Sequence, residues 1–191
     1  LLKVQVSDQI VLVTGAGGSI GSEICRQVLK RHPKILLLLE LSEYALYTIQ
    51  QELQVIVAKL DKMDGDNFLL PRVIPMLGSV QDERRLSKMM QAWKPEVIYH
   101  AAAYKHVPMV EHNLAEGIKN NVFGTLSVAK VAFEKGVSNF VLISTDKAVN
   151  PINVYGATKL CSDKLFVAGN SYTGWGSTRL GVVRYGNVMG S

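Results

Sequence analysis

Apolar residues in this chain gather in short continuous runs that alternate with longer stretches of helical periodicity. The runs Ile-Val-Leu-Val at 10–13 and Ile-Leu-Leu-Leu-Leu at 35–39 contain no polar residue, which is typical of parallel strands buried on both faces. Between such runs, apolar residues recur at the spacing of one helix face. The pattern predicts strands at residues 10–14, 34–39, 72–77, 97–101, 140–144 and 181–185, and helices at residues 22–30, 43–60, 82–93, 113–135 and 154–168.

Strands that alternate with helices in this way predict a doubly wound α/β domain, in which helices cover both faces of a parallel sheet. We expect a single domain over residues 1–191, with the polar stretch at 61–67 as a loop. The chain stops at Ser191, directly after a predicted strand and a glycine-containing turn. We therefore expect further chain after this residue to supply the rest of the substrate-binding region.

Composition narrows the class of protein. With 48% hydrophobic and 19% charged residues, the chain has the make-up of a folded globular domain. Its net charge of +5 is spread along the sequence, without a Lys/Arg-rich run or a zinc-finger spacing. This distribution favours a phosphorylated small molecule over nucleic acid, and we expect no metal site.

Targeting signals and cysteines indicate the cellular compartment of the protein. No apolar run approaches the ~20 residues of a membrane-spanning helix, and the first residues lack the pattern of a secretion signal. Cys25 and Cys161 are far apart, so we expect reduced thiols in a cytoplasmic protein. A membrane tether upstream of residue 1 and a homo-oligomer both stay open.

A glycine-rich turn follows the first predicted strand and opens the first helix. Glycines spaced three apart in this context let the backbone approach a pyrophosphate, which the N–H groups at the start of the helix then bind. A turn that only packs strand on helix is the alternative. The residues expected to contact a dinucleotide here are Gly15, Gly17, Gly18, Ser19, Ile20 and Gly21.

An acidic residue ends the second predicted strand. Glu40 lies about 20 residues after the glycine turn, where a carboxylate can accept hydrogen bonds from the adenosine ribose. No arginine occurs between Glu40 and Gln51 to bind a 2′-phosphate, so the sequence favours NAD over NADP. A solvated carboxylate at a strand end is the alternative. Asp82 is a candidate for contacting the adenine and, equally, for capping a helix.

A tyrosine and a lysine form the candidate catalytic pair. Tyr155 and Lys159 are four residues apart, so on a helix they share one face. Ser144 and Thr145 end the fifth strand, at the edge of the sheet where ligands bind in such folds. A phenol with a pKa near 10 is a poor base, and we expect the Lys159 ammonium to lower the pKa of Tyr155. A packed tyrosine beside a surface lysine is the alternative.

These motifs resemble those of a known family. The segment Thr-Gly-Ala-Gly-Gly-Ser-Ile-Gly at residues 14–21, together with Tyr155-x-x-x-Lys159, is similar to the extended short-chain dehydrogenase/reductase superfamily and its Rossmann-type domain. His-Ala-Ala-Ala-Tyr-Lys-His-Val-Pro at residues 100–108 and Ser-Thr-Asp-Lys-Ala-Val-Asn-Pro at residues 144–151 resemble the polysaccharide-biosynthesis dehydratases that act on UDP-N-acetylglucosamine. The similarity runs from about residue 10 to residue 191.

The resemblance implies a 4,6-dehydratase cycle on a UDP-N-acetylhexosamine. Hydride leaves C4 of the sugar, water is eliminated across C5 and C6, and the hydride returns to C6, so that a tightly bound NAD or NADP is regenerated. By this analogy Tyr155 takes the 4-hydroxyl proton, Thr145 hydrogen-bonds the same region and Asp146 donates a proton to the departing 6-hydroxyl. The resemblance also assigns Ala101, Ala103, Tyr155 and Lys159 to the cofactor, and Asn187 to the substrate. Lys105 follows the fourth strand, at the edge of the sheet where it can meet the sugar or the diphosphate.

Lys147 distinguishes this sequence from more familiar sugar 4,6-dehydratases, which carry Glu after the Asp. It matches the subgroup in which C5 can be inverted, with Lys147 either as the C5 base or as a charge that stabilises the enolate. A UDP-hexose 4-epimerase or reductase, which does not need Asp146 and Lys147, is the alternative enzyme. A non-catalytic NAD(P)-binding sensor is the alternative outside enzymes.

Overall fold

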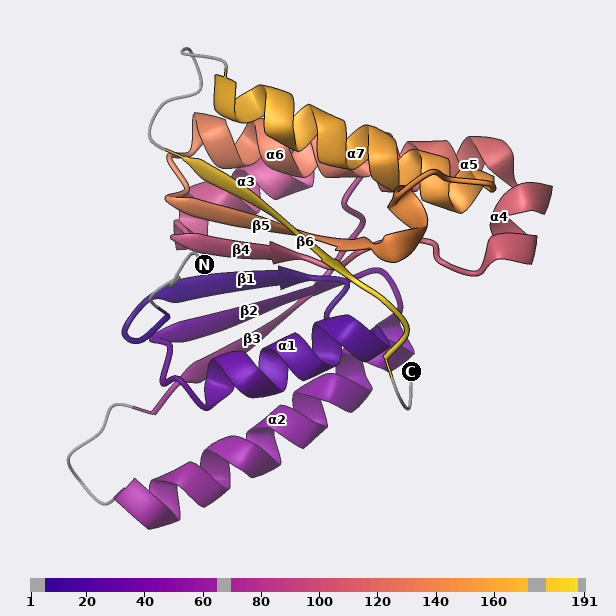
Figure 1. Ribbon diagram of the computed structural model, residues 1–191. Helices are drawn as coiled ribbons and strands as arrows, with labels where there is room; N and C mark the ends of the chain where they lie inside the picture. Colours follow the sequence, from indigo (N-terminus) through magenta and orange to yellow (C-terminus); the bar gives the residue numbers. More distant parts are fainter. Residues whose placement is uncertain (1–5, 65–69, 172–177, 189–191) are drawn as a thin grey trace.

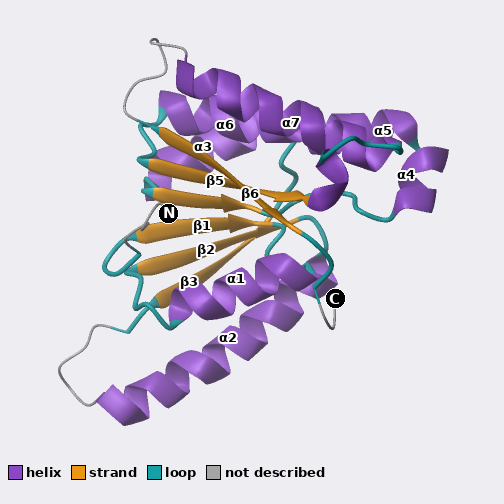
Figure 2. Ribbon diagram, viewed as in Figure 1, coloured by secondary structure: helices purple, strands orange, loops and turns teal. Residues whose placement is uncertain are grey.

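One parallel sheet organises the part of the chain that the structure describes. The computed structural model describes residues 6–64, 70–171 and 178–188. All strand pairs are parallel, in the order β3-β2-β1-β4-β5-β6. Helices lie on both faces of the sheet (Figures 1 and 2), as predicted for a doubly wound α/β fold. The strands are β1 (Ile10–Thr14), β2 (Ile35–Glu40), β3 (Arg72–Leu77), β4 (Val97–His100), β5 (Asn139–Thr145) and β6 (Arg179–Tyr185).

The strand order creates a crevice at one point of the sheet. From β1 the chain builds outward through β2 to β3, and it then returns to place β4 on the other side of β1. The loops that leave the carboxyl ends of β1 and β4 therefore diverge, which is where ligands bind in open α/β sheets. In this chain those loops are the glycine turn and residues 101–106.

Helices α1 and α2 cover one face of the sheet, and α3, α6 and α7 cover the other (Figure 1). None of the described helices combines the length and apolar character needed to cross a bilayer. Cys25 is buried, Cys161 is exposed, and neither is in a disulfide. The helical elements are α1 (Ser19–Leu29), α2 (Glu43–Asp64), α3 (Glu83–Trp93), α4 (Val107–His112), α5 (Leu114–Ile118), a π-helical turn (Lys119–Gly124), α6 (Thr125–Glu134), a 3₁₀ turn (Asp146–Ala148) and α7 (Val154–Ser171).

Several helix boundaries differ from the prediction, most of all at the start of α1 and at the ends of α2 and α7. α1 begins at Ser19 rather than at residue 22, because Gly18 takes the extended backbone of an N-cap and the residues after it are already helical. α2 continues to Asp64, so the loop predicted for residues 61–67 was wrong for residues 61–64. Polar residues suit an exposed helix as well as a loop, and polarity alone does not separate the two. Residues 65–67 lie outside the described residues.

The helix predicted over residues 113–135 is divided. A π-helical turn at Lys119–Gly124 separates α5 from α6. The Asn121 carbonyl accepts hydrogen bonds from the hydroxyls of Thr125, at 2.7 Å, and of Ser162 on α7, at 2.8 Å. Such turns are rare and frequently occur at functional sites. Apolar periodicity does not reveal them, because the residues on either side remain helical.

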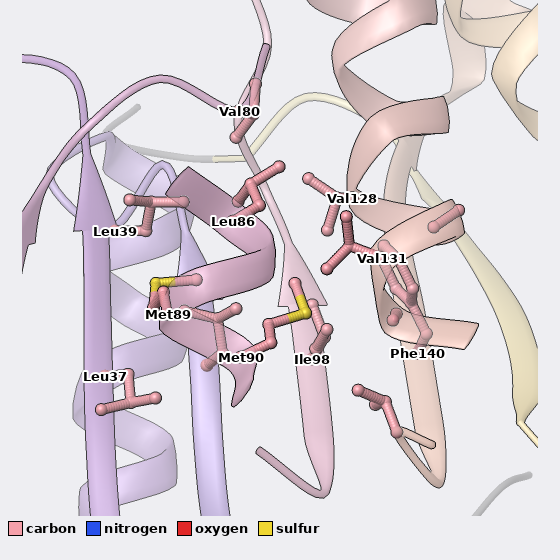
Figure 3. Packing of buried hydrophobic residues seen from close by; sticks show 14 of the residues in the cluster. Leu37, Leu39, Val80, Leu86, Met89, Met90, Ile98, Val128, Val131 and Phe140 are labelled. Carbon is pink, nitrogen blue, oxygen red and sulfur yellow. The ribbon is translucent and has the colours of Figure 1, made fainter. Parts of the chain in front are cut away.

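Alternate residues of the central strands supply two apolar layers. Leu37 and Leu39 of β2 pack with Met90 of α3 and Phe140 of β5 on one face (Figure 3), whereas their neighbours Leu36 and Leu38 pack against α1 and α2 on the other. β3 is an exception to the prediction of strands buried on both faces. It lies at the edge of the sheet, where several of its side chains are exposed.

Candidate active site

Two adjoining hollows lie in the crevice at the carboxyl ends of β1 and β4. The Tyr155 hollow has a volume of about 390 Å³ and extends toward α4 and α5. The Glu40 hollow has a volume of about 370 Å³ and extends along the ends of β2 and β3. They share part of their walls and together form one elongated depression. The residues that line both hollows are Gly18, Ala101, Ala103 and Tyr104.

Most of the predicted binding residues lie in these walls. Those in the Glu40 hollow alone are Gly15, Gly17 and Glu40. Those in the Tyr155 hollow alone are Ser19, Ile20, Gly21, Lys105, Tyr155 and Lys159. Asp82, Thr145, Asp146, Lys147 and Asn187 line neither hollow.

The glycine turn is packed so closely that a side chain would not fit at two positions. Gly15 has a φ of +67°, and a Cβ atom there would lie 2.7 Å from the backbone nitrogen of Ala102 in the loop after β4. A Cβ atom at Gly21 would collide with the carbonyl oxygen of Gly15. The turn therefore brings the start of α1 against the end of β4 and leaves the N-terminus of that helix facing the crevice, as anion binding requires.

We expect Gly15→Ala to weaken NAD binding at least tenfold, about 1.4 kcal/mol, because the new methyl group displaces the backbone of the β4 loop. Gly136→Ala is the matched control. Gly136 also has a positive φ, of +71°, but a Cβ atom there meets nothing within 4 Å. Both variants carry the backbone strain of a left-handed alanine, about 1 kcal/mol, and calorimetric titration should show an NAD defect in the first alone. Equal affinity in both variants would contradict the packing role of Gly15.

Glu40 belongs to the crevice but also has bonds of its own. Its carboxylate accepts hydrogen bonds from the backbone nitrogens of Gly17, at 3.0 Å, Leu41, at 2.8 Å, and Ser42, at 3.0 Å. These contacts fix the carboxylate between the glycine turn and the start of α2. The ribose contact stays a prediction, now for an oriented carboxylate in the wall of the hollow rather than a freely solvated one.

Asp82 lies where its capping role was predicted. Its Oδ1 atom accepts a hydrogen bond from the backbone nitrogen of Arg85, at 2.9 Å, and Asp82 is the N-cap of α3. The geometry thus supports the cap and gives no support to an adenine contact. Ser79 and Val80, in the segment before α3, line the Glu40 hollow together with Leu41 and Ser42. These four residues were missed because short apolar and hydroxyl side chains carry no distinctive pattern.

α7 presents Tyr155 and Lys159 to the crevice, and its start is held in place from two sides. The backbone nitrogen of Val154 donates to Glu111 of α4, at 2.7 Å, and that of Gly156 donates to Asn153, at 2.7 Å. Tyr155 is 9% exposed and Lys159 is 3% exposed. The alternative of a surface lysine beside a packed tyrosine is therefore wrong for this lysine.

The predicted effect of Lys159 on Tyr155 is not found. Burial raises the pKa of Tyr155, and the neighbouring Tyr185 and Asp146 raise it further, while a hydrogen bond with Thr145 opposes them. The Lys159 ammonium donates instead to the carbonyl oxygen of Ile143 on β5, at 2.7 Å. Burial lowers the pKa of Lys159 to about 8. The Tyr155 side chain is thus a neutral phenol at neutral pH.

The turn after β5 forms a hydrogen-bonded row beside the Tyr155 hollow. The Thr145 hydroxyl bonds with Tyr155 and donates to Asp146 Oδ1, at 3.0 Å. The Lys147 ammonium lies 3.5 Å from the same oxygen and 3.4 Å from Asn187 Oδ1. The structure therefore brings Thr145, Asp146, Lys147 and Asn187 together in one row, and none of the four lines either hollow.

Asp146 is an ionised carboxylate in this arrangement. Its hydrogen bond with Thr145 holds its pKa below the usual range, and the charge of Lys147 lowers it further. An acid role, as predicted from the resemblance, requires the carboxylate to take up a proton first. Burial under a bound sugar would favour the neutral acid, because burial penalises charge.

Ser144 places a buried hydroxyl in the wall of the Tyr155 hollow. It lines the Tyr155 hollow, is 2% exposed, and its Oγ atom has no hydrogen-bond partner among the described residues. Buried polar atoms are nearly always paired. An unpaired hydroxyl beside Tyr155 therefore indicates a ligand group that completes its hydrogen bonding.

A buried polar network lies behind the site and was not predicted. The Thr125 hydroxyl donates to the Asn121 carbonyl, so its oxygen accepts from His100 Nε2, at 2.9 Å, and His100 Nδ1 accepts from Thr14, at 2.7 Å. Burial lowers the pKa of His100 to about 3, so it is a neutral imidazole that joins β1, β4 and the π-helical turn.

Asn121 extends this network to the loop that lines both hollows. Its side chain accepts from the backbone nitrogen of Tyr104, at 2.8 Å, and donates to the Tyr104 carbonyl, at 3.0 Å, and to Thr158 of α7, at 3.1 Å. The Asn121 side chain thus holds the backbone of this loop in place. The sequence offered no signal for its partners, which lie 17 and 37 residues away.

Comparisons with known proteins agree with this geometry. The family model described as "Polysaccharide biosynthesis protein" matches residues 11–191. The capsular polysaccharide biosynthesis protein CapD of Staphylococcus aureus is 45% identical over 191 residues, which are 100% of this chain and 30% of that protein. A UDP-N-acetylglucosamine 4,6-dehydratase (inverting) of Campylobacter jejuni is 40% identical over 95% of this chain and 49% of its own length.

A solved structure gives the same result at the level of the fold. The X-ray structure of Pen from Bacillus thuringiensis superposes with a TM-score of 0.84 and 33% identity, over 98% of this chain and 55% of that one. The chain therefore spans about half the length, or less, of the relatives it resembles.

Proposed function

Because the chain belongs to the polysaccharide biosynthesis protein family, we propose that it is the cofactor-binding and catalytic part of a UDP-N-acetylhexosamine 4,6-dehydratase. UDP-N-acetylglucosamine is the substrate we favour. The reaction is a lyase reaction with an internal redox cycle, and it would supply a 4-keto-6-deoxy sugar for surface polysaccharide or other glycan precursors in the cytoplasm.

One observation carries this proposal. Tyr155, which suits oxidation at C4, is joined through the Thr145 hydroxyl to Asp146, which suits elimination at C6. An epimerase or reductase needs the first group but has no use for the second. A non-catalytic sensor needs neither, and would have no reason to bury a lysine and a tyrosine beside an unpaired serine hydroxyl.

The crevice fits a dinucleotide. Gly15 and Gly21 allow the close packing of the turn against the loop after β4, and the start of α1 offers N–H groups to a pyrophosphate. The Glu40 hollow would hold the adenosine half, with Glu40 toward the ribose, and the Tyr155 hollow the nicotinamide half, with Lys159 and Ser144 at its wall. When bound, NAD takes hydride from C4 and returns it to C6; we favour NAD over NADP because Glu40 occupies the ribose end.

The protein groups then have separate tasks. Tyr155 would accept the proton of the 4-hydroxyl, and a cationic cofactor held in the crevice would offset the raised pKa of this phenol. The resulting C4 ketone acidifies the C5 proton. Once that proton leaves, Asp146 protonates the C6 oxygen, which departs as water.

Lys147 is placed to act at C5. Its ammonium lies at the rim, between Asp146 and Asn187, and it would serve either as the group that exchanges the C5 proton or as a charge that stabilises the enolate. Inversion at C5 requires the proton to return from the face opposite to the one it left. We propose inversion as the outcome that matches a lysine at this position.

The test is NMR of the full-length protein incubated in D2O with UDP-N-acetylglucosamine and catalytic NAD or NADP. We expect a 4-keto-6-deoxy product with deuterium at C5 and with the C6 methyl group carrying the hydrogen from C4. The coupling pattern of the sugar ring reports inversion or retention at C5. A 4-epimer formed without loss of water would overturn the dehydratase in favour of an epimerase, and bound cofactor without turnover would favour the sensor.

A further inference from the structure

A third ionisable residue follows Tyr155 and Lys159 along the same face of α7. Asp163 lies one helical turn beyond Lys159 and two turns beyond Tyr155, at the spacing that places residues on one face. Its side chain is 3% exposed. Buried carboxylates are rare unless they are paired, and the proposed reaction gives Asp163 no contact with the substrate or the cofactor.

Asp163 is held from β6. Arg184 Nε donates to Asp163 Oδ2, at 2.7 Å, and the arginine side chain is 42% exposed. The other oxygen, Oδ1, is buried and has no hydrogen-bond partner among the described residues. The ion pair is therefore one-sided: it fixes the carboxylate in place but leaves one oxygen unsatisfied inside the protein, where its field is weakly screened.

Lys159 is the buried cation that lies nearest to Asp163 along α7. Burial favours its neutral amine, and the negative charge of Asp163 opposes this effect and raises the Lys159 pKa. The distance between them exceeds that of an ion pair, because the Lys159 ammonium donates to the Ile143 carbonyl instead. The carboxylate therefore acts through its field, and the ammonium remains turned toward the crevice wall.

We propose that Asp163, anchored by Arg184, is a positioning residue that keeps the buried Lys159 protonated at the working pH of the enzyme. This inference rests on the proposed function only because that function places Lys159 in the cofactor-binding and catalytic site. Without the carboxylate, a lysine that is 3% exposed would lose its proton within the physiological range. It would then no longer bring a positive charge to the wall of the Tyr155 hollow.

Other titratable groups face Lys159 and Tyr155 and also influence their pKa values. The neutral His100 faces Lys159 from β4, and the lysine charge contributes to lowering the His100 pKa. Tyr185 of β6 and Asp146 of the 3₁₀ turn face Tyr155, and both raise its pKa. None of these groups supplies the negative charge near Lys159 that Asp163 supplies.

The test is a direct titration of Lys159. Full-length protein with NAD bound is labelled at lysine with ¹³C and ¹⁵N, and the Nζ signal is assigned by its loss in Lys159→Arg. We expect Asp163→Asn to move the titration of this ammonium down by about one pH unit relative to the wild type. Asp163→Glu, which retains the charge, should restore it toward the wild-type value.

Kinetics gives a second readout that a purely structural role would not move. In Asp163→Asn we expect the alkaline decline of kcat to shift down by the same unit. kcat should fall about fivefold near pH 8 and change little near pH 6.5, with KM for UDP-N-acetylglucosamine altered less than about twofold. Glu83→Gln is the control, because it removes an exposed acid that pairs with Lys130 away from the crevice.

The outcomes separate cleanly. An unchanged Lys159 titration in folded Asp163→Asn overturns the inference. If that variant does not fold, the double variant Asp163→Asn/Arg184→Gln, which leaves neither partner unpaired, decides by the same titration. A shifted titration in a protein that shows no dehydratase activity would sustain the role of Asp163 and reject the proposed function instead.

Discussion

Replacing Tyr155 with phenylalanine is expected to lower kcat about a thousandfold while leaving the cofactor bound. The substitution removes one oxygen and keeps the ring that fills the wall of the Tyr155 hollow. Without the hydroxyl, the site loses the group that we propose accepts the 4-hydroxyl proton. Both turnover and the first hydride transfer should be lost, as measured by product NMR and by single-turnover absorbance of the reduced cofactor.

Tyr99→Phe provides the matched control. Tyr99 is also a partly buried phenol whose pKa is raised by burial, but it packs against the apolar layer under α1 and α2 and lines neither hollow. We expect it to keep kcat within about twofold, since it lies outside the site. A Tyr155→Phe enzyme that turned over within tenfold of wild type would show that another group removes the proton.

Asp146→Asn is expected to stop the reaction halfway. The amide keeps the size of the side chain and the hydrogen bond from Thr145, but it cannot donate a proton to the departing 6-hydroxyl. Elimination should slow by about 10²- to 10³-fold, whereas oxidation at C4 continues, so a 4-keto hexose and reduced cofactor should accumulate. Rapid quenching with mass spectrometry would detect the ketone before loss of water.

Asp146 lies at an exposed rim, so we expect the free energy of unfolding to change by less than about 0.5 kcal/mol. Lys147→Met should be measured beside Asp146→Asn. It removes the neighbouring charge but leaves the acid, and it should reduce deuterium exchange at C5 more than it reduces oxidation at C4. If Asp146→Asn instead blocked reduction of the cofactor, Asp146 would belong to the oxidation step and the division of tasks would be wrong.

The alternation of apolar runs with helical periodicity was enough to predict the fold class. The strand predicted at residues 72–77 has the bounds of β3, and Ile10–Thr14 has those of β1. Such runs are reliable because burial on both faces of a sheet tolerates few polar residues. The errors include the end of α2, the exposed side chains of the edge strand β3, and the division of residues 113–135 by a π-helical turn.

For the site, the sequence determined which chemical groups are present and at which edge of the sheet they lie. Residues that follow parallel strands share that edge whatever their distance along the chain. The glycine turn after β1, the loop after β4 and the turn after β5 therefore had to meet, and Tyr155 and Lys159 had to share a helix face. These relations depend on local geometry alone, and a motif records local geometry.

Only the tertiary structure decided the protonation states and the supporting contacts. Burial by distant elements, not the neighbouring lysine, dominates the pKa of Tyr155, and the hydrogen bond with Thr145 fixes the charge of Asp146. The clamp of Asn121 on Tyr104 and the anchor of Arg184 on Asp163 join residues 17 and 21 positions apart. Desolvation and hydrogen bonding depend on what packs around a group in three dimensions, and no pattern along the chain records that.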